Sequence, residues 1–108
     1  MLKTLTSRYV AAFNARDADA CAALMHEDFV LEDPIVKRLE GRTAAMAAIT
    51  GMFSGCETLS FVARNIFQDG DTTLIEFVLT IDGKTLTGVD VISWREGKMQ
   101  EMRAYLDV

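Results

Sequence analysis

The stretch LIEFVLTIDGKTLTGVDVISW, Leu74 to Trp94, is typical of two β-strands joined by a tight turn. Asp82-Gly83 is a strong turn signal, and side chains on either side of it alternate between two faces. In the first run, apolarity favours an inner face made of Ile75, Phe77, Leu79 and Ile81. In the second run, the corresponding face contains Leu86, Gly88, Asp90, Ile92 and Trp94. Asp90 therefore occupies an apolar row, where an unpartnered charge is strongly unfavourable.

Turn signals of the same kind occur on both sides of this stretch, at Asp69-Gly70 and Glu96-Gly97. They predict four antiparallel strands from Thr58 to the end of the sequence. In the last strand, the more apolar face consists of Met102, Ala104, Leu106 and Val108. Because Gly88 and Ala104 are small residues on inner faces, we expect a hollow between the sheet and whatever covers it.

The preceding part of the chain is predicted to be mainly helical. Helical spacing indicates an amphipathic helix over 1–15, with Tyr9 on its inner stripe, and a second helix over 18–25 that Asp17 caps. The segment DFVLEDP then predicts a short strand ended by Pro34, in which Asp33 shares a face with apolar neighbours. A loop through Gly41 leads to a third helix over 42–53. We therefore expect one α+β domain over 1–108, with a curved sheet folded over three helices.

Composition excludes several classes of function. The 108 residues are 50% apolar, which suits one compact core. A net charge of −5 without any basic run argues against nucleic acid as a partner. No long apolar run is present, so we expect no membrane partner and a cytoplasmic location. Two isolated cysteines, Cys21 and Cys56, and a single histidine, His26, argue against a metal site.

Three ionisable side chains, Tyr9, Asp33 and Asp90, are predicted to point inward from different elements. Such groups are candidates for chemistry, because burial raises the pKa of a carboxyl group. Each also has a structural explanation. Asp90 could lie in a bulge or pair with a cation such as Arg103, Asp33 could only end its strand, and Tyr9 could bond a backbone carbonyl in the core.

The segments RYVAAFNARDADACAALMHEDFVLEDP, EGRTAAMAAI and GVDVISWREGKMQEMRAYLDV together resemble the ketosteroid isomerase branch of the NTF2-like, or SnoaL-like, superfamily. The resemblance runs over nearly the whole chain, from Leu5 to Asp107. It implies a cone-shaped fold in which three helices pack on a curved antiparallel sheet and enclose a pocket. It also implies a homodimer formed through the outer face of the sheet.

The resemblance implies roles for all three inward groups. Asp33, in the Glu-Asp-Pro triplet, corresponds to the base that moves a proton alpha to a carbonyl. Tyr9 and Asp90 correspond to the two oxyanion donors, and Asp90 would stay protonated so that it can donate a hydrogen bond. No metal or cofactor is implied, and the expected ligand is a small hydrophobic carbonyl compound or phenol. The expected apolar contacts with this ligand are Phe13, Ile49, Ile75, Phe77, Leu86, Met102 and Leu106.

The sequence departs from the steroid enzymes in the wall of the expected pocket. Met25 and Ile49 occupy positions where those enzymes have further tyrosines, and Leu106 replaces an aromatic residue. Two alternatives therefore stay open: a binding module without catalysis, and a related cyclase, dehydratase or epoxide hydrolase. Arg103 is predicted to point outward, which argues against the hydrolase, since that chemistry would need an inward arginine.

Overall fold

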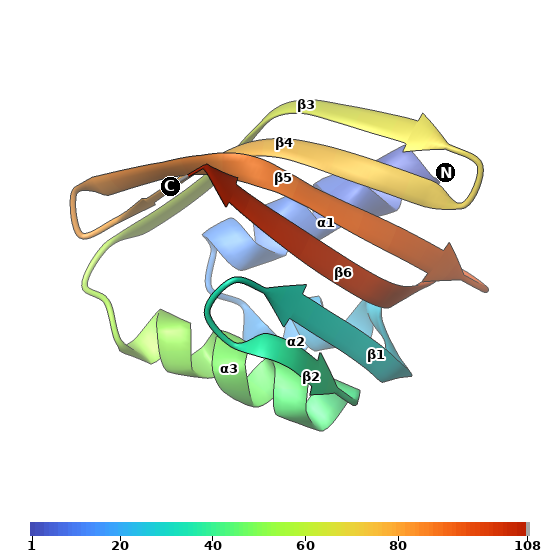
Figure 1. Ribbon diagram of the computed structural model, residues 1–108, viewed down its shortest axis with the longest axis horizontal. Helices are drawn as coiled ribbons and strands as arrows, with labels where there is room; N and C mark the ends of the chain where they lie inside the picture. Colours follow the sequence, from blue (N-terminus) through green and yellow to red (C-terminus); the bar gives the residue numbers. More distant parts are fainter. Residues whose placement is uncertain (108) are drawn as a thin grey trace.

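The computed structural model describes residues 1–107, so the expected inner position of Val108 lies outside the described residues. The elements are, in chain order, α1 (Leu2–Asn14), α2 (Ala18–Ala23), β1 (Met25–Asp33), β2 (Lys37–Glu40), α3 (Arg42–Ser54), β3 (Leu59–Asp69), β4 (Thr72–Ile81), β5 (Lys84–Arg95) and β6 (Lys98–Asp107). Two long helices and one short helix pack on a single sheet, which confirms the α+β class (Figure 1). Within residues 1–107, no helix is long and apolar enough to cross a membrane.

The sheet has six strands in the order β2-β1-β6-β5-β4-β3. The four strands expected after Thr58 are β3 to β6, and they are antiparallel as predicted. The prediction of a wholly antiparallel sheet is wrong, because β1 pairs with β6 in parallel. The segment expected to be a loop before Gly41 also contains β2, which forms an antiparallel edge with β1. These two pairings bring the end of β1 beside the last strand of the chain.

Two of the turns have the geometry that tight hairpins require. Asp82-Gly83 joins β4 to β5 with φ angles of 49° and 82°, and Glu96-Gly97 joins β5 to β6 with φ angles of 53° and 76°. Positive φ at both central residues is the mark of a type I′ turn, whose twist matches that of the flanking strands. These turns set the register of the strand that carries Asp90.

The helix boundaries follow from local hydrogen bonds. Asp17 caps α2 as predicted, since its Oδ1 accepts from the Ala20 N–H at 3.1 Å. Met25, expected in this helix, is instead the first residue of β1. Arg16, between α1 and α2, has a φ of 54°, and its guanidinium donates to the carbonyls of Phe53, Cys56 and Glu57. This side chain ties the end of α1 to the segment that follows α3.

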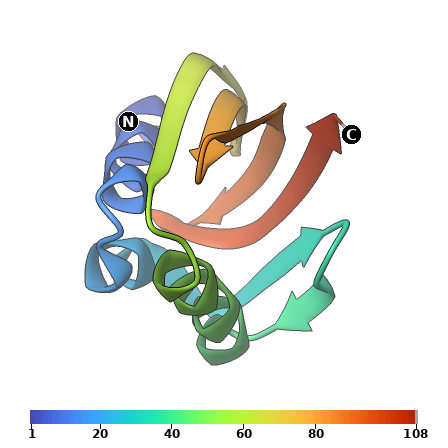
Figure 2. The same cartoon turned by 90° about the vertical axis from the view of Figure 1, so that its left-hand side faces the viewer.

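The helices cover one face of the curved sheet, as the end-on view in Figure 2 shows. Helix α1 contacts β3 and β4, whereas α3 contacts β1 and β2, and α2 lies against both helices. The inner faces chosen from apolarity are confirmed in β4 and β5, where Ile75 and Ile92 are fully buried. Below them, Trp94 Nε1 donates to Thr73 Oγ1, which also bonds Thr6 Oγ1, so this part of the core is filled and hydrogen-bonded.

Position 88 has no room for a side chain larger than that of glycine, because the backbone of β6 and an aromatic ring lie against it. It lies opposite Phe77 on β4 and Leu106 on β6. A Cβ atom there would overlap the Tyr105 carbonyl oxygen and would lie 2.9 Å from the Phe77 ring. The space beside Gly88 is therefore occupied, so the hollow expected from the small residues Gly88 and Ala104 does not lie against this glycine.

Candidate active site

A cavity of about 140 Å³ lies between the curved sheet and the helices. Tyr9 from α1, Asp33 from β1 and Asp90 from β5 all line it, although they come from elements far apart in the sequence. The remaining wall is apolar. The structure thus brings the three sequence-predicted site residues to one enclosed space.

Six of the seven expected apolar contacts line the cavity: Phe13, Ile49, Phe77, Leu86, Met102 and Leu106. Ile75 does not line it, because its side chain is fully buried in the core beneath the cavity wall. The lining also includes Ala104, one of the two small residues expected beside a hollow. Residues that were not expected there are Leu31, Ile35, Met52, Phe61, Leu79 and Ile81. Leu31 shares a strand face with Asp33, so alternation along β1 was a signal that could have found it.

Asp90 is 5% exposed and lies in the regular part of β5, opposite Ile75 on one side and Ala104 on the other. The bulge in this strand falls at Ser93 and Trp94 instead. Within residues 1–107 the carboxyl group has no hydrogen bond or ion pair, so it is not neutralised by a cation. Burial, with a smaller effect of the Asp33 charge, raises the pKa of Asp90 from 3.8 to about 7.

Arg103, considered above as a partner of Asp90, is occupied elsewhere. Its Nη1 donates to Glu101 Oε1 at 2.7 Å, and it does not line the cavity. Glu101 also accepts from Arg38 Nη1 at 3.0 Å. This partly exposed ionic network links β2, which carries Arg38, to β6, which carries Glu101 and Arg103. An inward arginine of the kind that the hydrolase alternative requires is therefore not supplied by Arg103.

Tyr9 is 1% exposed, and its hydroxyl is buried without a hydrogen-bond partner among the residues described. Burial raises the pKa of Tyr9 well above its usual value, and the charges of Asp90 and Cys21 raise it further. The phenol therefore stays protonated and retains a hydrogen to donate. Met25 and Ile49, which replace the supporting tyrosines of the steroid enzymes, are buried apolar side chains that offer no hydrogen bond.

Asp33 differs from Asp90 in its surroundings. It ends β1, is partly exposed, and its Oδ1 accepts from the backbone N–H groups of Ile35 at 2.7 Å and Val36 at 2.6 Å. The Asp-Pro turn expected from the sequence is present, and it holds this carboxylate in position. The same side chain thus orders the turn and lines the cavity.

The register of the sheet explains why the two acids face the same space. Glu32 on β1 is opposite Arg103 on β6, so Asp33 and Ala104 come next along these parallel strands. Ala104 is in turn opposite Asp90 on β5. The two acids therefore flank one intervening strand, with backbones about 10 Å apart by the usual strand spacing. The small side chain of Ala104 leaves the space between them open.

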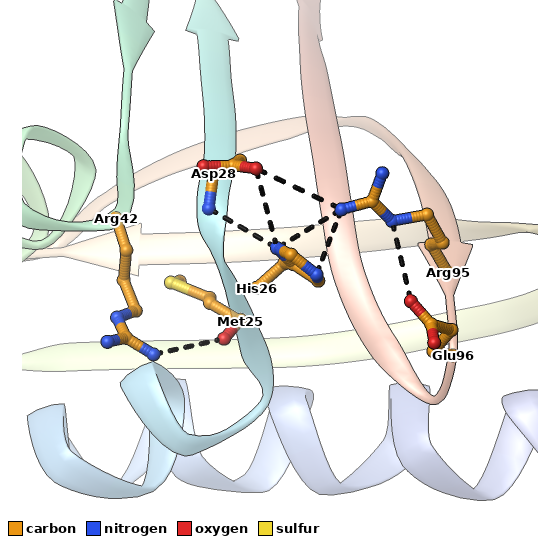
Figure 3. A network of polar contacts seen from close by, with 6 residues as sticks. All are labelled: Met25, His26, Asp28, Arg42, Arg95 and Glu96. Atoms are coloured by element: carbon orange, nitrogen blue, oxygen red, sulfur yellow. Dashed lines mark hydrogen bonds and ion pairs between the residues drawn. The ribbon is translucent and has the colours of Figure 1, made fainter.

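Other polar groups of the molecule lie away from this cavity. Figure 3 shows His26 and Asp28 of β1 beside Arg95, with His26 Nε2 at 2.9 Å from Arg95 Nη2. A wider depression of about 640 Å³ lies beside Asp82, which already accepts from the N–H groups of Glu57 and Thr58. In both places the polar atoms bond one another and secure neighbouring elements. Among residues 1–107, the buried side-chain atoms without a hydrogen-bond partner include Tyr9 OH, inside the cavity, and Gln100 Oε1 on β6, outside it.

Comparison with known families agrees with this geometry. A family model described as a SnoaL-like domain matches residues 6–102. The chain belongs to the SnoaL-like family. Its fold is shared by solved structures described as NTF2-like, as ketosteroid isomerase-like and as a polyketide cyclase. No curated protein matches it in sequence.

Solved structures share the fold of this SnoaL-like chain at low sequence identity. An NTF2-like protein of unknown function from Cytophaga hutchinsonii ATCC 33406 has a TM-score of 0.87 and 19% identity, over 99% of this chain and 90% of the other. A SnoaL-like polyketide cyclase candidate from Jannaschia sp. CCS1 has a TM-score of 0.83 and 22% identity, over 96% and 83%. A protein of ketosteroid isomerase-like fold from Catenulispora acidiphila DSM 44928, solved with trimethylamine, has a TM-score of 0.82 and 17% identity, over 94% and 83%.

Proposed function

We propose that this SnoaL-like protein is an isomerase that shifts a proton alpha to a carbonyl on a small hydrophobic substrate. The observation that carries the proposal concerns Tyr9 and Asp90, which are buried and have no hydrogen-bond partner among residues 1–107. They line the same cavity as the better solvated Asp33. An unpaired buried hydroxyl costs about 1–3 kcal/mol, so its retention favours an oxygen atom of a ligand as its partner.

In this proposal Asp33 is the base. Its carboxylate takes a proton from the carbon between the carbonyl and the double bond, and the electron pair of that C–H bond moves into an enolate. Asp33 then returns the proton to the far carbon of the conjugated system, so that the double bond moves and the enzyme is regenerated. The turn that fixes Oδ1 keeps the carboxylate in one orientation during both transfers.

Tyr9 and Asp90 stabilise the negative charge that develops on the enolate oxygen. Each donor of this type contributes roughly 3–4 kcal/mol to transition-state stabilisation. Asp90 can donate only while it is protonated, and with a pKa of about 7 roughly half of it carries the proton at neutral pH. The two acids would thus take opposite roles because their environments differ.

The test of the base follows the conversion of cyclohex-3-enone to its conjugated isomer by ultraviolet absorbance. Asp33→Asn retains an oxygen that can accept the two turn hydrogen bonds, and we expect it to lower kcat by about 10²-fold or more. Asp28→Asn, on the same strand but 72% exposed, is the matched control and should retain activity. Equal rates for the wild type and Asp33→Asn would remove Asp33 from the mechanism.

A second candidate function is capture of a small ligand without turnover, and the loss of supporting tyrosines at Met25 and Ile49 favours it. Binding of phenol separates the two proposals. If Tyr9 serves as an oxyanion donor, phenol binds as the phenolate, and Tyr9→Phe weakens it by about tenfold or more. Phenol affinity that is unaffected by Tyr9→Phe would favour simple hydrophobic capture.

We also propose that two copies associate through the outer face of the sheet. This face carries Val62, Phe67 and Tyr105, each more than half exposed, at 52%, 55% and 55%. Exposed apolar patches of this kind commonly mark interfaces. Light scattering should give a dimer mass that Tyr105→Glu reduces to that of the monomer, and a monomeric wild type at all concentrations would refute the proposal.

A further inference from the structure

We infer that the cavity accepts substrates of one ring only, and that Ile35 sets this limit at its mouth. The inference rests on the proposed function for the chemistry of the substrate, a monocyclic unsaturated ketone. The size limit itself rests on the volume, the depth and the mouth of the cavity.

The volume is small for a ligand site. A cavity of about 150 Å³ with an apolar lining holds one benzene ring, whereas sites for drug-sized molecules span about 300–1,000 Å³. The cavity here is about 140 Å³. Its walls include packed aromatic rings, with Phe13 and Phe61 at 4.8 Å and Phe61 and Phe77 at 5.2 Å between ring centres. Such packing resists expansion, because overfilled cores force neighbouring side chains out of favourable rotamers.

The groups of the cavity follow a gradient of exposure. Tyr9 and Asp90 are 1% and 5% exposed and lie at its closed end, Asp33 is partly exposed, and Ile35 is 78% exposed at the mouth. A carbonyl bound to Tyr9 and Asp90 would therefore sit at the bottom, with the carbon that loses its proton nearer Asp33. A further ring would extend toward the exposed part of the lining, where Ile35 is the most exposed residue.

The turn that carries Ile35 also positions the base. The N–H groups of Ile35 and Val36 bond Asp33 Oδ1 at 2.7 Å and 2.6 Å. An outward shift of this turn to admit a second ring would therefore also move the Asp33 carboxylate. A larger substrate would therefore lose the orientation of Asp33 at the same time as it gained room. Ile35 therefore limits the size of the substrate, and its backbone N–H is hydrogen-bonded to the base, Asp33.

The experiment is a calorimetric titration of the purified protein with phenol, naphthol and estradiol, which share a phenolic hydroxyl but differ in ring number. We expect phenol to bind about tenfold or more tightly than estradiol. Without a size limit, the larger apolar surface of estradiol would reverse that order. Estradiol affinity equal to or above that of phenol would overturn the inference, as would the absence of phenol binding.

The role of Ile35 is tested with Ile35→Ala, a change at an exposed site that leaves the core intact. It should reduce the preference for phenol over naphthol by about threefold or more, whereas Val10→Ala, on α1 outside the cavity, should not. An unchanged preference in Ile35→Ala would exclude Ile35 as the limit.

Turnover of cyclohex-3-enone and of a β,γ-unsaturated steroid ketone separates this inference from the proposed function. A higher kcat/KM for the steroid would overturn the size limit and leave the isomerase proposal standing. Turnover of neither ketone, with phenol bound and estradiol excluded, would refute the isomerase and support the size limit.

Discussion

Asp90 on β5 lies directly opposite Ala104 on β6, and both line the cavity that also contains Asp33. A residue with a longer side chain at position 104 would occupy the space between the two acids. The alanine is therefore as important for the site as the acids themselves, because it leaves room for a ligand between them.

Ala104→Leu should fill this space. We expect phenol affinity and kcat/KM for cyclohex-3-enone to fall by about tenfold or more, because the added atoms exclude the ligand. Calorimetry and the absorbance assay measure the two effects. Ala47→Leu, an equal change on the exposed face of α3, is the control and should alter neither. Full affinity in Ala104→Leu would show that the ligand binds elsewhere.

Asp90→Asn should change how stability depends on pH. The folded-state pKa of Asp90 is raised from 3.8 to about 7, so the native state holds this proton more tightly than the unfolded state. The stability associated with that proton is fully present below about pH 4 and is lost as the pH rises through about 7. The resulting decrease in the free energy of unfolding reaches about 4 kcal/mol.

Urea unfolding of both proteins between acidic and mildly alkaline pH measures this difference. Relative to the wild type, Asp90→Asn should gain stability as the pH rises and reach a plateau above about pH 7. Two pH profiles of the same shape would mean that Asp90 has an ordinary carboxyl environment in the folded protein.

The rate of isomerisation should also depend on the protonation of Asp90. If the protonated acid is an oxyanion donor, kcat/KM decreases above about pH 7, approaching tenfold per pH unit. Asp90→Asn has a side-chain amide that donates at every pH, so its lower rate should lack this decrease. The absorbance assay over a pH series gives both profiles, and a decrease that persists in Asp90→Asn would assign it to another group.

Gly88→Ala should destabilise the fold. The added methyl group would overlap the backbone carbonyl of Tyr105 and approach the Phe77 ring, at a cost of about 1–3 kcal/mol or more. Gly51→Ala is the matched control, because this glycine lies inside α3 with nothing near its missing Cβ, and the change should stabilise by about 0.5–1 kcal/mol. Thermal unfolding distinguishes the two, and equal effects would mean that β5 and β6 can separate at Gly88.

Local features of the fold could be predicted from the sequence because local interactions determine them. The turns at Asp82-Gly83 and Glu96-Gly97, the cap at Asp17 and the alternation that buries Ile75 all depend on residues close together in the chain. Pairing between distant strands has no such signature. The parallel contact of β1 with β6 was therefore missed. The short strand β2 pairs locally with β1, and it was missed because its sequence, Lys-Arg-Leu-Glu, is mainly charged.

In the candidate site, too, features set by local interactions could be predicted, whereas contacts between distant parts of the chain could not. Periodicity indicated that Tyr9 and Asp90 point inward, and their burial confirms the direction. Periodicity could not show how neighbouring side chains share space. The expected hollow is present beside Ala104, whereas the Phe77 ring occupies the space beside Gly88. Ile35 was missed because exposed turns are normally polar. An aliphatic residue directly after Asp-Pro was the available signal, and only the structure shows that it borders a cavity.

The parallel pairing of β1 with β6 has a consequence for the folding of the protein during its synthesis. Leu31 and Met102 are opposite each other although most of the chain separates them. Contacts of such long range form late, since the intervening segment must first be ordered. A nascent chain from which β6 has not yet emerged therefore has its tyrosine and its first acid but no enclosed space. The cavity forms only after β6 has been synthesised and can pair with β1.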